Sequence, residues 1–329
     1  MKNLLVLLFC IQVAVTFAKG QNEDCFKELR RYGGIATFDL HIKDELGRPV
    51  DHADGSAWFW YRNSSTLAEG TSDENGRLLL SNSAKVDGGY TIRKKGYYNT
   101  VQQSIYFEAP SEPFGFLERR RWKPVVQNVT LKTKRNPTSM FSHTLYRKPI
   151  PKWNTSIGFD LQVADWIKPY GEGNVVDVYI TVYTAEAKIG KRMRQQPSKI
   201  VFDFPQRYDG VQIHNADKWS EFISSYMVDL EEPFSKQLEL TPDKSNYPWF
   251  SPSKYIVFRS RSKENATGEL ESCHYGKIYP SIDVTADGLS IMSIIFNPVS
   301  NSTNLEFDPQ RNLTNKSSLH GSTQRQSTP

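Results

Sequence analysis

Residues 34–50 read GIATFDLHIKDELGRPV, and their pattern predicts the structure of the first part of the chain. Positions 36, 38, 40 and 42 of this stretch are apolar, and the positions between them are mostly polar. Successive side chains of a β-strand point to opposite faces, so this period of two predicts a strand with one buried face. Gly47 and Pro49, which follow, are typical of a turn.

Similar patterns continue to about residue 134. An aromatic strand is expected at 57–61, a tight hairpin connection at Asn75-Gly76, a strand interrupted by a glycine at 90–98, and a closing strand at 125–132. The 12% share of aromatic residues also favours strands. Short alternating strands separated by Gly and Pro turns predict a β-sandwich.

Taken together, residues 34–134 resemble the carboxypeptidase regulatory-like domain, also called transthyretin-like or prealbumin-like, and the collagen-adhesin B-type repeats. The motifs that carry the resemblance are, in order, Gly47-Arg48-Pro49-Val50, Thr71 with Gly76, Tyr90-x-Ile92 with Gly96-Tyr97, and Val129-x-Leu131. A polar segment at 51–55 and a long connection at 104–124 depart from the family pattern. The resemblance implies an accessory module that serves stability, spacing or recognition.

A second β-rich domain is predicted for residues 143–310, after a linker at 135–142 that is polar and contains a proline. Strand patterns recur through it and a helical period is weak, restricted to 218–226, so we expect an antiparallel sandwich or a jelly-roll-like unit. The predicted fold class is therefore all-β, with two β-sandwich domains. Segments at 158–173 and 304–309 resemble parts of uncharacterised exported bacterial proteins.

The N-terminus predicts export. Lys2 precedes an apolar run at 4–15, and Thr16-Phe17-Ala18 supplies small residues for cleavage after Ala18. We expect a signal peptide at 1–18, an arm at 19–33, and a disordered Ser/Thr-rich tail at 311–329. No later stretch is long enough for a membrane span, so the mature protein is expected in the periplasm or outside the cell, without a transmembrane anchor.

Removal of the signal peptide leaves two cysteines, Cys25 and Cys273. Export permits a disulfide between them, and two separate thiols are the equally open alternative, because two residues show no spacing pattern. Seven Asn-x-Ser/Thr sequons would be glycan acceptors in a eukaryotic secretory pathway, and would mean nothing in a bacterium.

Charge and motifs exclude several function classes. The net charge of +5 is small for 329 residues, and the basic residues form only short runs, so no nucleic-acid partner is expected. The chain contains no Gly-x-Ser-x-Gly elbow, phosphate loop, dinucleotide fingerprint or His-Glu-x-x-His, and its six histidines lack metal-ligand spacing. We therefore assign no catalytic, cofactor-binding or metal-binding residue, and expect no cofactor.

One loop offers a candidate ligand site. Asp160 and Asp165 precede Trp166, and carboxylates beside an aromatic ring suit a glycosidase, a sugar-binding cleft or a calcium site. The alternative is that these carboxylates bond the backbone of the turns around them. Any of the tryptophans could stack on a sugar, although most are expected in the core: Trp58, Trp60, Trp122, Trp153, Trp166, Trp219 and Trp249.

Three functions remain open. The first is an exported, non-enzymatic binding or structural protein whose partner is a protein or a glycan. The second is a carbohydrate-binding protein or glycan-active enzyme on the second sandwich, acting through Asp160, Asp165 and Trp166. The third, a peptidase inhibitor or accessory subunit, rests only on analogy with the regulatory-like domain.

Overall fold

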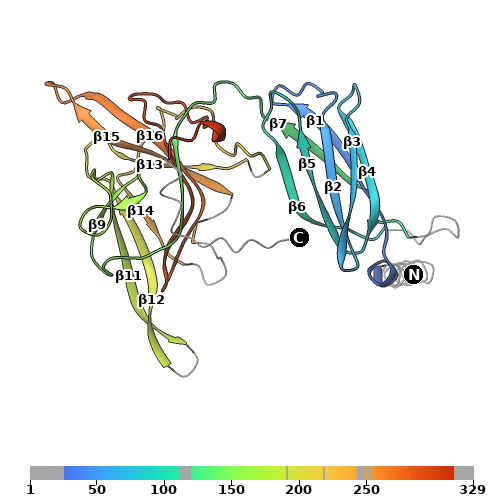
Figure 1. The fold of residues 1–329 in the computed structure, drawn as a ribbon, viewed down its shortest axis with the longest axis horizontal. Coiled ribbons are helices and arrows are strands. Elements are labelled where there is room, and N and C mark those ends of the chain that lie inside the picture. The colour runs from blue at the N-terminus through green and yellow to red at the C-terminus, as the bar shows by residue number, and fades with distance from the viewer. Residues whose placement is uncertain are drawn as a thin grey trace, which may run out of the picture. The chain divides into compact units, whose positions relative to one another are not determined.

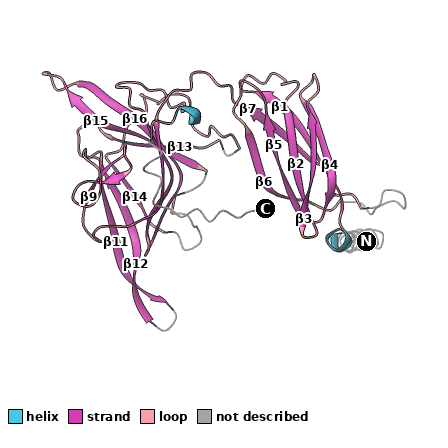
Figure 2. Cartoon of the chain, viewed as in Figure 1, coloured by secondary structure: helices cyan, strands magenta, loops and turns pink. Residues whose placement is uncertain are grey.

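The computed structural model describes residues 26–110, 120–189, 192–217, 219–242, 249–250 and 253–314. Nearly all regular structure in these residues is β-strand (Figure 2), which confirms the all-β prediction. Backbone contacts divide the chain into two compact units. The first contains the described residues up to Lys134 together with Trp219–Phe222, and the second contains the remaining ones.

The first unit is a sandwich of two sheets (Figure 1). One sheet has the order β4-β1-β7 and the other the order β3-β2-β5-β6. All neighbouring strands are antiparallel except β1 and β7, which are parallel. The strands are β1 (Gly34–Asp44), β2 (Asp54–Tyr61), β3 (Ser64–Thr71), β4 (Arg77–Ala84), β5 (Asp87–Arg93), β6 (Thr100–Tyr106) and β7 (Val125–Leu131).

Aromatic side chains fill the space between these two sheets. The ring of Phe38, on β1, lies 5.2 Å from that of Phe59, 5.5 Å from Tyr90 and 5.6 Å from Phe107. The alternation predicted from the sequence of residues 34–50 is confirmed, since every second residue of β1 from Gly34 to Asp44 is buried. Aromatic pairs at these separations stabilise a core beyond the area that they bury.

Two strands of the first unit carried no clear sequence pattern. β3 and β6 have few buried residues and few apolar ones, so no alternation of apolar and polar residues predicts them. Hydrogen bonding to neighbouring strands with a clearer pattern determines where these two strands lie: β3 pairs with β2, and β6 pairs with β5. At the β6 edge, Trp219–Phe222 adds a further contact, a bridge between Thr100 and Ser220, and residues 219–226 form no helix despite the weak helical period there.

The second unit is built from two five-stranded sheets, in the orders β10-β9-β11-β12-β14 and β13-β15-β16-β17-β8, with every neighbouring pair antiparallel. Apolar side chains from both sheets form its main core. The strands are β8 (Phe141–Lys148), β9 (Ile157–Asp160), β10 (Asp165–Trp166), β11 (Val178–Ile189), β12 (Arg192–Asp203), β13 (Gly210–Asn215), β14 (Gln237–Leu240), β15 (Lys254–Glu264), β16 (Leu270–Thr285) and β17 (Gly288–Phe296).

Ser72 offers a test of the first sandwich. Its hydroxyl is buried, donates to the carbonyl of Val50 at 2.8 Å and accepts from the amide of Ala53 at 2.9 Å. Ser72→Ala leaves both backbone groups without a partner, so we expect a loss of about 2 kcal/mol in the free energy of unfolding, measured with urea. Ser64→Ala, at an exposed position of β3, is the control and should change it by less than about 0.5 kcal/mol. Equal effects of the two substitutions would contradict this role of Ser72.

Candidate functional site

Asp160, one of the residues predicted from sequence to bind a ligand, is almost fully buried at 3% exposure. One carboxylate oxygen accepts from the amide of Gln162 at 3.0 Å, and the other accepts from the amides of Asn174 and Val175, each at 3.1 Å. The guanidinium of Arg261 donates to the first oxygen at 2.9 Å. The carboxylate therefore holds a loop together and has little capacity left for a ligand.

Arg261 joins Asp160 to a second buried carboxylate, Asp177. Arg261 Nε donates to Asp177 Oδ1 at 2.8 Å, and the other Asp177 oxygen accepts from the amide of Leu161 at 2.8 Å. Burial raises the pKa of Asp177, which is inaccessible to solvent, and the bonds from Arg261 offset part of that rise. The guanidinium also lies 4.8 Å from the centre of the Phe296 ring. This triad is a closed internal network.

Asp165 and Trp166 are likewise occupied within the protein. An ion pair joins Asp165 to Lys148 at 2.6 Å, and Asp165 also accepts from the amide of Trp166 at 2.7 Å. The Trp166 indole is 1% exposed, packs edge-on against Phe159 and donates to the carbonyl of Pro149 at 2.9 Å. The ring therefore has no free face on which a sugar could stack.

The structure describes one of the two cysteines that follow the predicted signal peptide. Cys25 lies outside the described residues, so their pairing stays a prediction. Cys273 is buried and forms no disulfide with any described residue, and its Sγ lies 3.7 Å from Oδ1 of Asn301. Burial raises the pKa of this thiol, which makes it a poor nucleophile.

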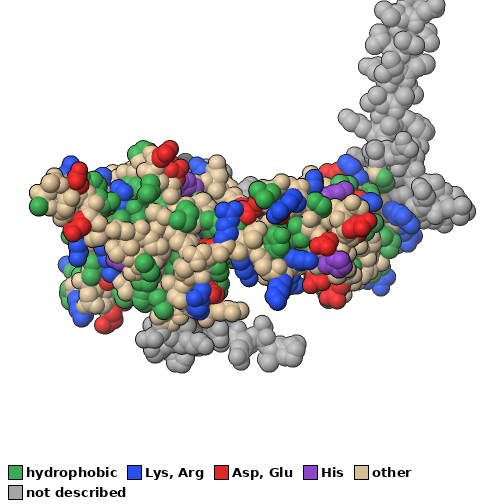
Figure 3. All heavy atoms as spheres, turned by 90° about the horizontal axis from the view of Figure 1, so that it is seen from above, with side chains coloured by type: hydrophobic (Ala, Val, Ile, Leu, Met, Phe, Trp, Pro, Cys, Tyr) green, Lys and Arg blue, Asp and Glu red, His purple; other side chains and the backbone are tan. Residues whose placement is uncertain are grey.

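Within the described residues, no group of three or more His, Cys, Asp or Glu side chains is arranged to hold a metal ion. In the same part of the chain, no helix has the length and apolar character needed to cross a membrane. On the face seen in Figure 3, basic and acidic side chains are interspersed with uncharged ones.

The structure separates the seven tryptophans into two groups. Trp122 and Trp166 are buried, and each donates its indole N–H to a backbone carbonyl. The others are at least partly exposed, and three of them line pockets: Trp153 in the second unit, and Trp58 with Trp60 in the first. An exposed indole is the better indication of a binding site, because burying so large an apolar ring would stabilise the fold.

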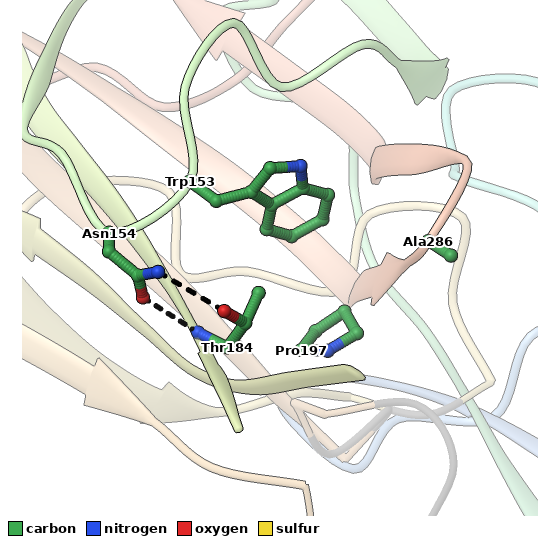
Figure 4. Close-up of a pocket in the computed structure, with 5 residues that line it drawn as sticks. All are labelled: Trp153, Asn154, Thr184, Pro197 and Ala286. Atoms are coloured by element: carbon green, nitrogen blue, oxygen red, sulfur yellow. Dashed lines mark hydrogen bonds between the residues drawn. The ribbon is translucent and has the colours of Figure 1, made fainter. Parts of the chain in front are cut away.

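The pocket beside Trp153 has a volume of about 560 Å³ and is also lined by Asn154, Thr184, Pro197 and Ala286 (Figure 4). Its polar side chains are bonded to each other. Asn154 Nδ2 donates to Thr184 Oγ1 at 3.1 Å, and the amide of Thr184 donates to Asn154 Oδ1 at 2.9 Å. This pocket therefore offers a ring, but few free polar groups with which to orient a ligand.

The second pocket lies on the outer face of the four-stranded sheet, and we call it the aromatic pocket. It has a volume of about 470 Å³ and its lining residues are Trp58, Trp60, Ser65, Val86, Asp87 and Tyr106. Trp60 is 43% exposed and Tyr106 is 70% exposed. Three aromatic side chains from two strands thus surround one carboxylate on an open sheet surface.

Strand geometry places these side chains together. Trp58 and Trp60 are two residues apart on β2, so they point to the same face, about 7 Å apart along the strand. Asp87 on β5 is directly opposite Tyr106 on β6. Trp58 is opposite Gly89, where an added Cβ would lie 2.8 Å from the indole Nε1, so only glycine leaves the indole its place over β5.

In the part of the chain that the structure describes, the polar side-chain groups of the aromatic pocket lack partners. Among the described residues, no hydrogen bond or ion pair engages the Asp87 carboxylate, the two indole N–H groups or the Tyr106 hydroxyl. Burial raises the pKa of Asp87, and no cation among the described residues lowers it again. Unpaired polar groups around an apolar surface are what a binding site needs to orient a ligand.

No protein-family model and no curated protein matches the chain, so the resemblance of residues 34–134 to the regulatory-like domain stays a prediction. Among solved structures, 3-chlorocatechol 1,2-dioxygenase from Rhodococcus opacus is 16% identical over 31% of this chain, with a TM-score of 0.24. The chain spans 61% of that enzyme. Matches at this level carry no argument about function.

Two further matches cover more of the chain but have lower TM-scores. The shaft pilin from Lactobacillus rhamnosus is 9% identical, with 76% of this chain and 88% of the pilin covered and a TM-score of 0.19. A Bacteroides uniformis protein, provisionally described as carbohydrate binding, is 10% identical, with 81% and 98% covered and a TM-score of 0.18.

The Arg261 network makes a testable claim about the sequence-predicted loop. Arg261→Leu leaves the buried Asp177 charge without its cation, so we expect the free energy of unfolding at pH 7 to fall by about 3–5 kcal/mol. Because burial raises the pKa of Asp177 in the folded state, that carboxyl binds its proton more tightly when folded. The deficit of the variant should therefore shrink as the pH falls through that raised pKa.

Urea unfolding from pH 7 to pH 4 measures this deficit. Arg147→Leu is the control, since Arg147 forms an exposed pair with Asp287 at 3.3 Å and its loss should change stability by less than about 1 kcal/mol. A deficit for Arg261→Leu that stays constant or grows on acidification would rule out an uncompensated Asp177 charge as its cause.

Proposed function

We propose that this protein is an exported binding protein that recognises carbohydrate through the aromatic pocket of its first sandwich. The observation that carries the proposal is the pair of solvent-facing indoles, Trp58 and Trp60, next to Tyr106 and an unpartnered Asp87. A sugar ring has an apolar face of C–H groups and a polar rim. An indole ring bordered by free hydrogen-bonding groups complements both parts.

The number of carboxyl groups in the site favours binding without catalysis. Hydrolysis of a glycosidic bond ordinarily uses two carboxyl groups placed on either side of that bond. Of the described residues that line the aromatic pocket, Asp87 alone is acidic. We therefore propose a binding protein, and we place its site on the first sandwich instead of on the loop with Asp160, Asp165 and Trp166, whose polar atoms are engaged internally.

Export of the mature chain remains part of the proposal, supported by the signal-peptide pattern at 1–18, which lies outside the described residues. An exported protein meets polysaccharides of cell surfaces and surroundings. A shallow, open site on a sheet suits such polymers better than an enclosed cavity would.

A panel of soluble oligosaccharides tests the proposal by calorimetry. The panel includes the β-1,4-linked hexasaccharides of glucose, N-acetylglucosamine and glucosamine. We expect at least one to bind, and Trp58→Ala and Trp60→Ala each to weaken that binding at least about tenfold, as truncation of a central aromatic anchor does elsewhere. Thermal melting of each variant checks that it remains folded.

Trp153→Ala is the matched control, because it removes the indole from the pocket of the second unit (Figure 4). It should leave affinity within about twofold if the aromatic pocket is the site. Loss of binding in Trp153→Ala, with Trp58→Ala and Trp60→Ala unaffected, would move the site to the second unit. No binding across the whole panel would end the carbohydrate proposal.

A further inference from the structure

We propose that the aromatic pocket selects saccharides with a positive charge, namely oligosaccharides of amino sugars whose amine is free and protonated. This inference rests on the proposed function and adds the chemical class of the ligand. It starts from the charge of the site. Of its described lining residues, Asp87 alone is charged at neutral pH, and none is a Lys or Arg.

Asp87 differs from the other shielded acids of the same unit. The Asp39 carboxylate accepts two hydrogen bonds from Arg77, at 2.9 and 2.8 Å, and the Asp44 carboxylate accepts one from Arg48 at 2.7 Å. The pKa of each of these two groups is lowered from its ordinary value. Asp87 loses hydration and gains no bond to a cation within the described residues, which leaves its charge uncompensated.

An ammonium group supplies what this position lacks. It would form a charge-assisted hydrogen bond with Asp87, and it would be attracted to the electron-rich faces of the rings of Trp58, Trp60 and Tyr106. A carboxylated or sulfated sugar would meet repulsion from Asp87 with no lining cation to offset it. A neutral sugar would gain the stacking contacts but leave the charge uncompensated.

The extent of the surface favours an oligosaccharide over a small free cation. Tyr106 also lines a neighbouring pocket of about 350 Å³, formed with apolar residues that include Pro124 and Val125 and with one ion pair, Lys123 to Glu108 at 3.0 Å, whose opposite charges offset each other. The surface therefore continues past Tyr106 toward the start of β7. An isolated ammonium ion would occupy only the part beside Asp87, whereas a chain of amino sugars would use both pockets.

The three hexasaccharides of the panel form a matched set, because they share a β-1,4 backbone and differ at C2, which carries a hydroxyl, an acetamide or an amine. At pH 5.5 and low salt, we expect the glucosamine hexamer to bind at least about tenfold more tightly than the other two, given the strength of hydrogen bonds to charged groups. Added salt should reduce this preference.

Asp87→Asn keeps the size of the side chain and removes its charge. It should remove the preference for the glucosamine hexamer over the two neutral hexamers. Glu69→Gln is the control, since Glu69 is an exposed acid on β3 of the same sheet that lines neither pocket. The preference should survive Glu69→Gln.

NMR of the wild-type chain gives a second readout that does not depend on a variant folding. Addition of the glucosamine hexamer should lower the pKa of the Asp87 carboxyl, and addition of the glucose hexamer should not. A peptide with trimethyllysine tests the competing occupant. Binding of that peptide with no binding of any hexasaccharide would overturn both this inference and the proposed function.

Other outcomes separate the two claims. Equal binding of the three hexamers, or an equal effect of Asp87→Asn on all of them, would overturn the amino-sugar inference and leave carbohydrate binding intact. A preference that Glu69→Gln reduces as much as Asp87→Asn would show general attraction to an acidic surface, and would also overturn the inference. Binding of none of the three would remove the basis of both.

Discussion

Burial of Ala57 and Phe59 in the core of the first sandwich fixes the direction of every other side chain of β2. The period of a strand is two, so Trp58 and Trp60 must face outward as long as those neighbours face inward. A shift of the register by one residue would send both indoles into the core and expose Phe59. The exposed indoles are thus held in place by the same packing that stabilises the sandwich.

The charged side chains that are shielded from solvent have different environments in the two units. In the second unit, Asp160, Asp177 and Arg261 satisfy one another and the backbone around them, which stabilises a loop but offers nothing to a ligand. In the first unit, Asp87 is partly desolvated beside three aromatic rings without such partners among the described residues. An unpaired charge of this kind lowers stability, and a bound cation would compensate it.

Comparison of the two tryptophan-lined pockets shows why volume alone does not identify a site. The pocket beside Trp153 is the larger, at about 560 Å³ against about 470 Å³. Its Asn154 and Thr184 are bonded to each other, so they contribute mainly to the geometry of the loop. The smaller pocket keeps its polar groups available, and specificity depends on such groups.

The all-β fold class could be predicted from the sequence, because alternation of period two is visible in single strands such as residues 34–44. The sequence also predicted an aromatic strand at 57–61, and the period of two in the strand that the structure shows there puts Trp58 and Trp60 on one face. It did not reveal which of the seven tryptophans are exposed, nor that Asp160, Asp165 and Trp166 are engaged internally. It gave no indication that Asp87 and Tyr106 belong to a site. These points follow from the three-dimensional packing, since pairing between β5 and β6, and the loss of hydration at Asp87, depend on contacts between residues that are not neighbours in the sequence.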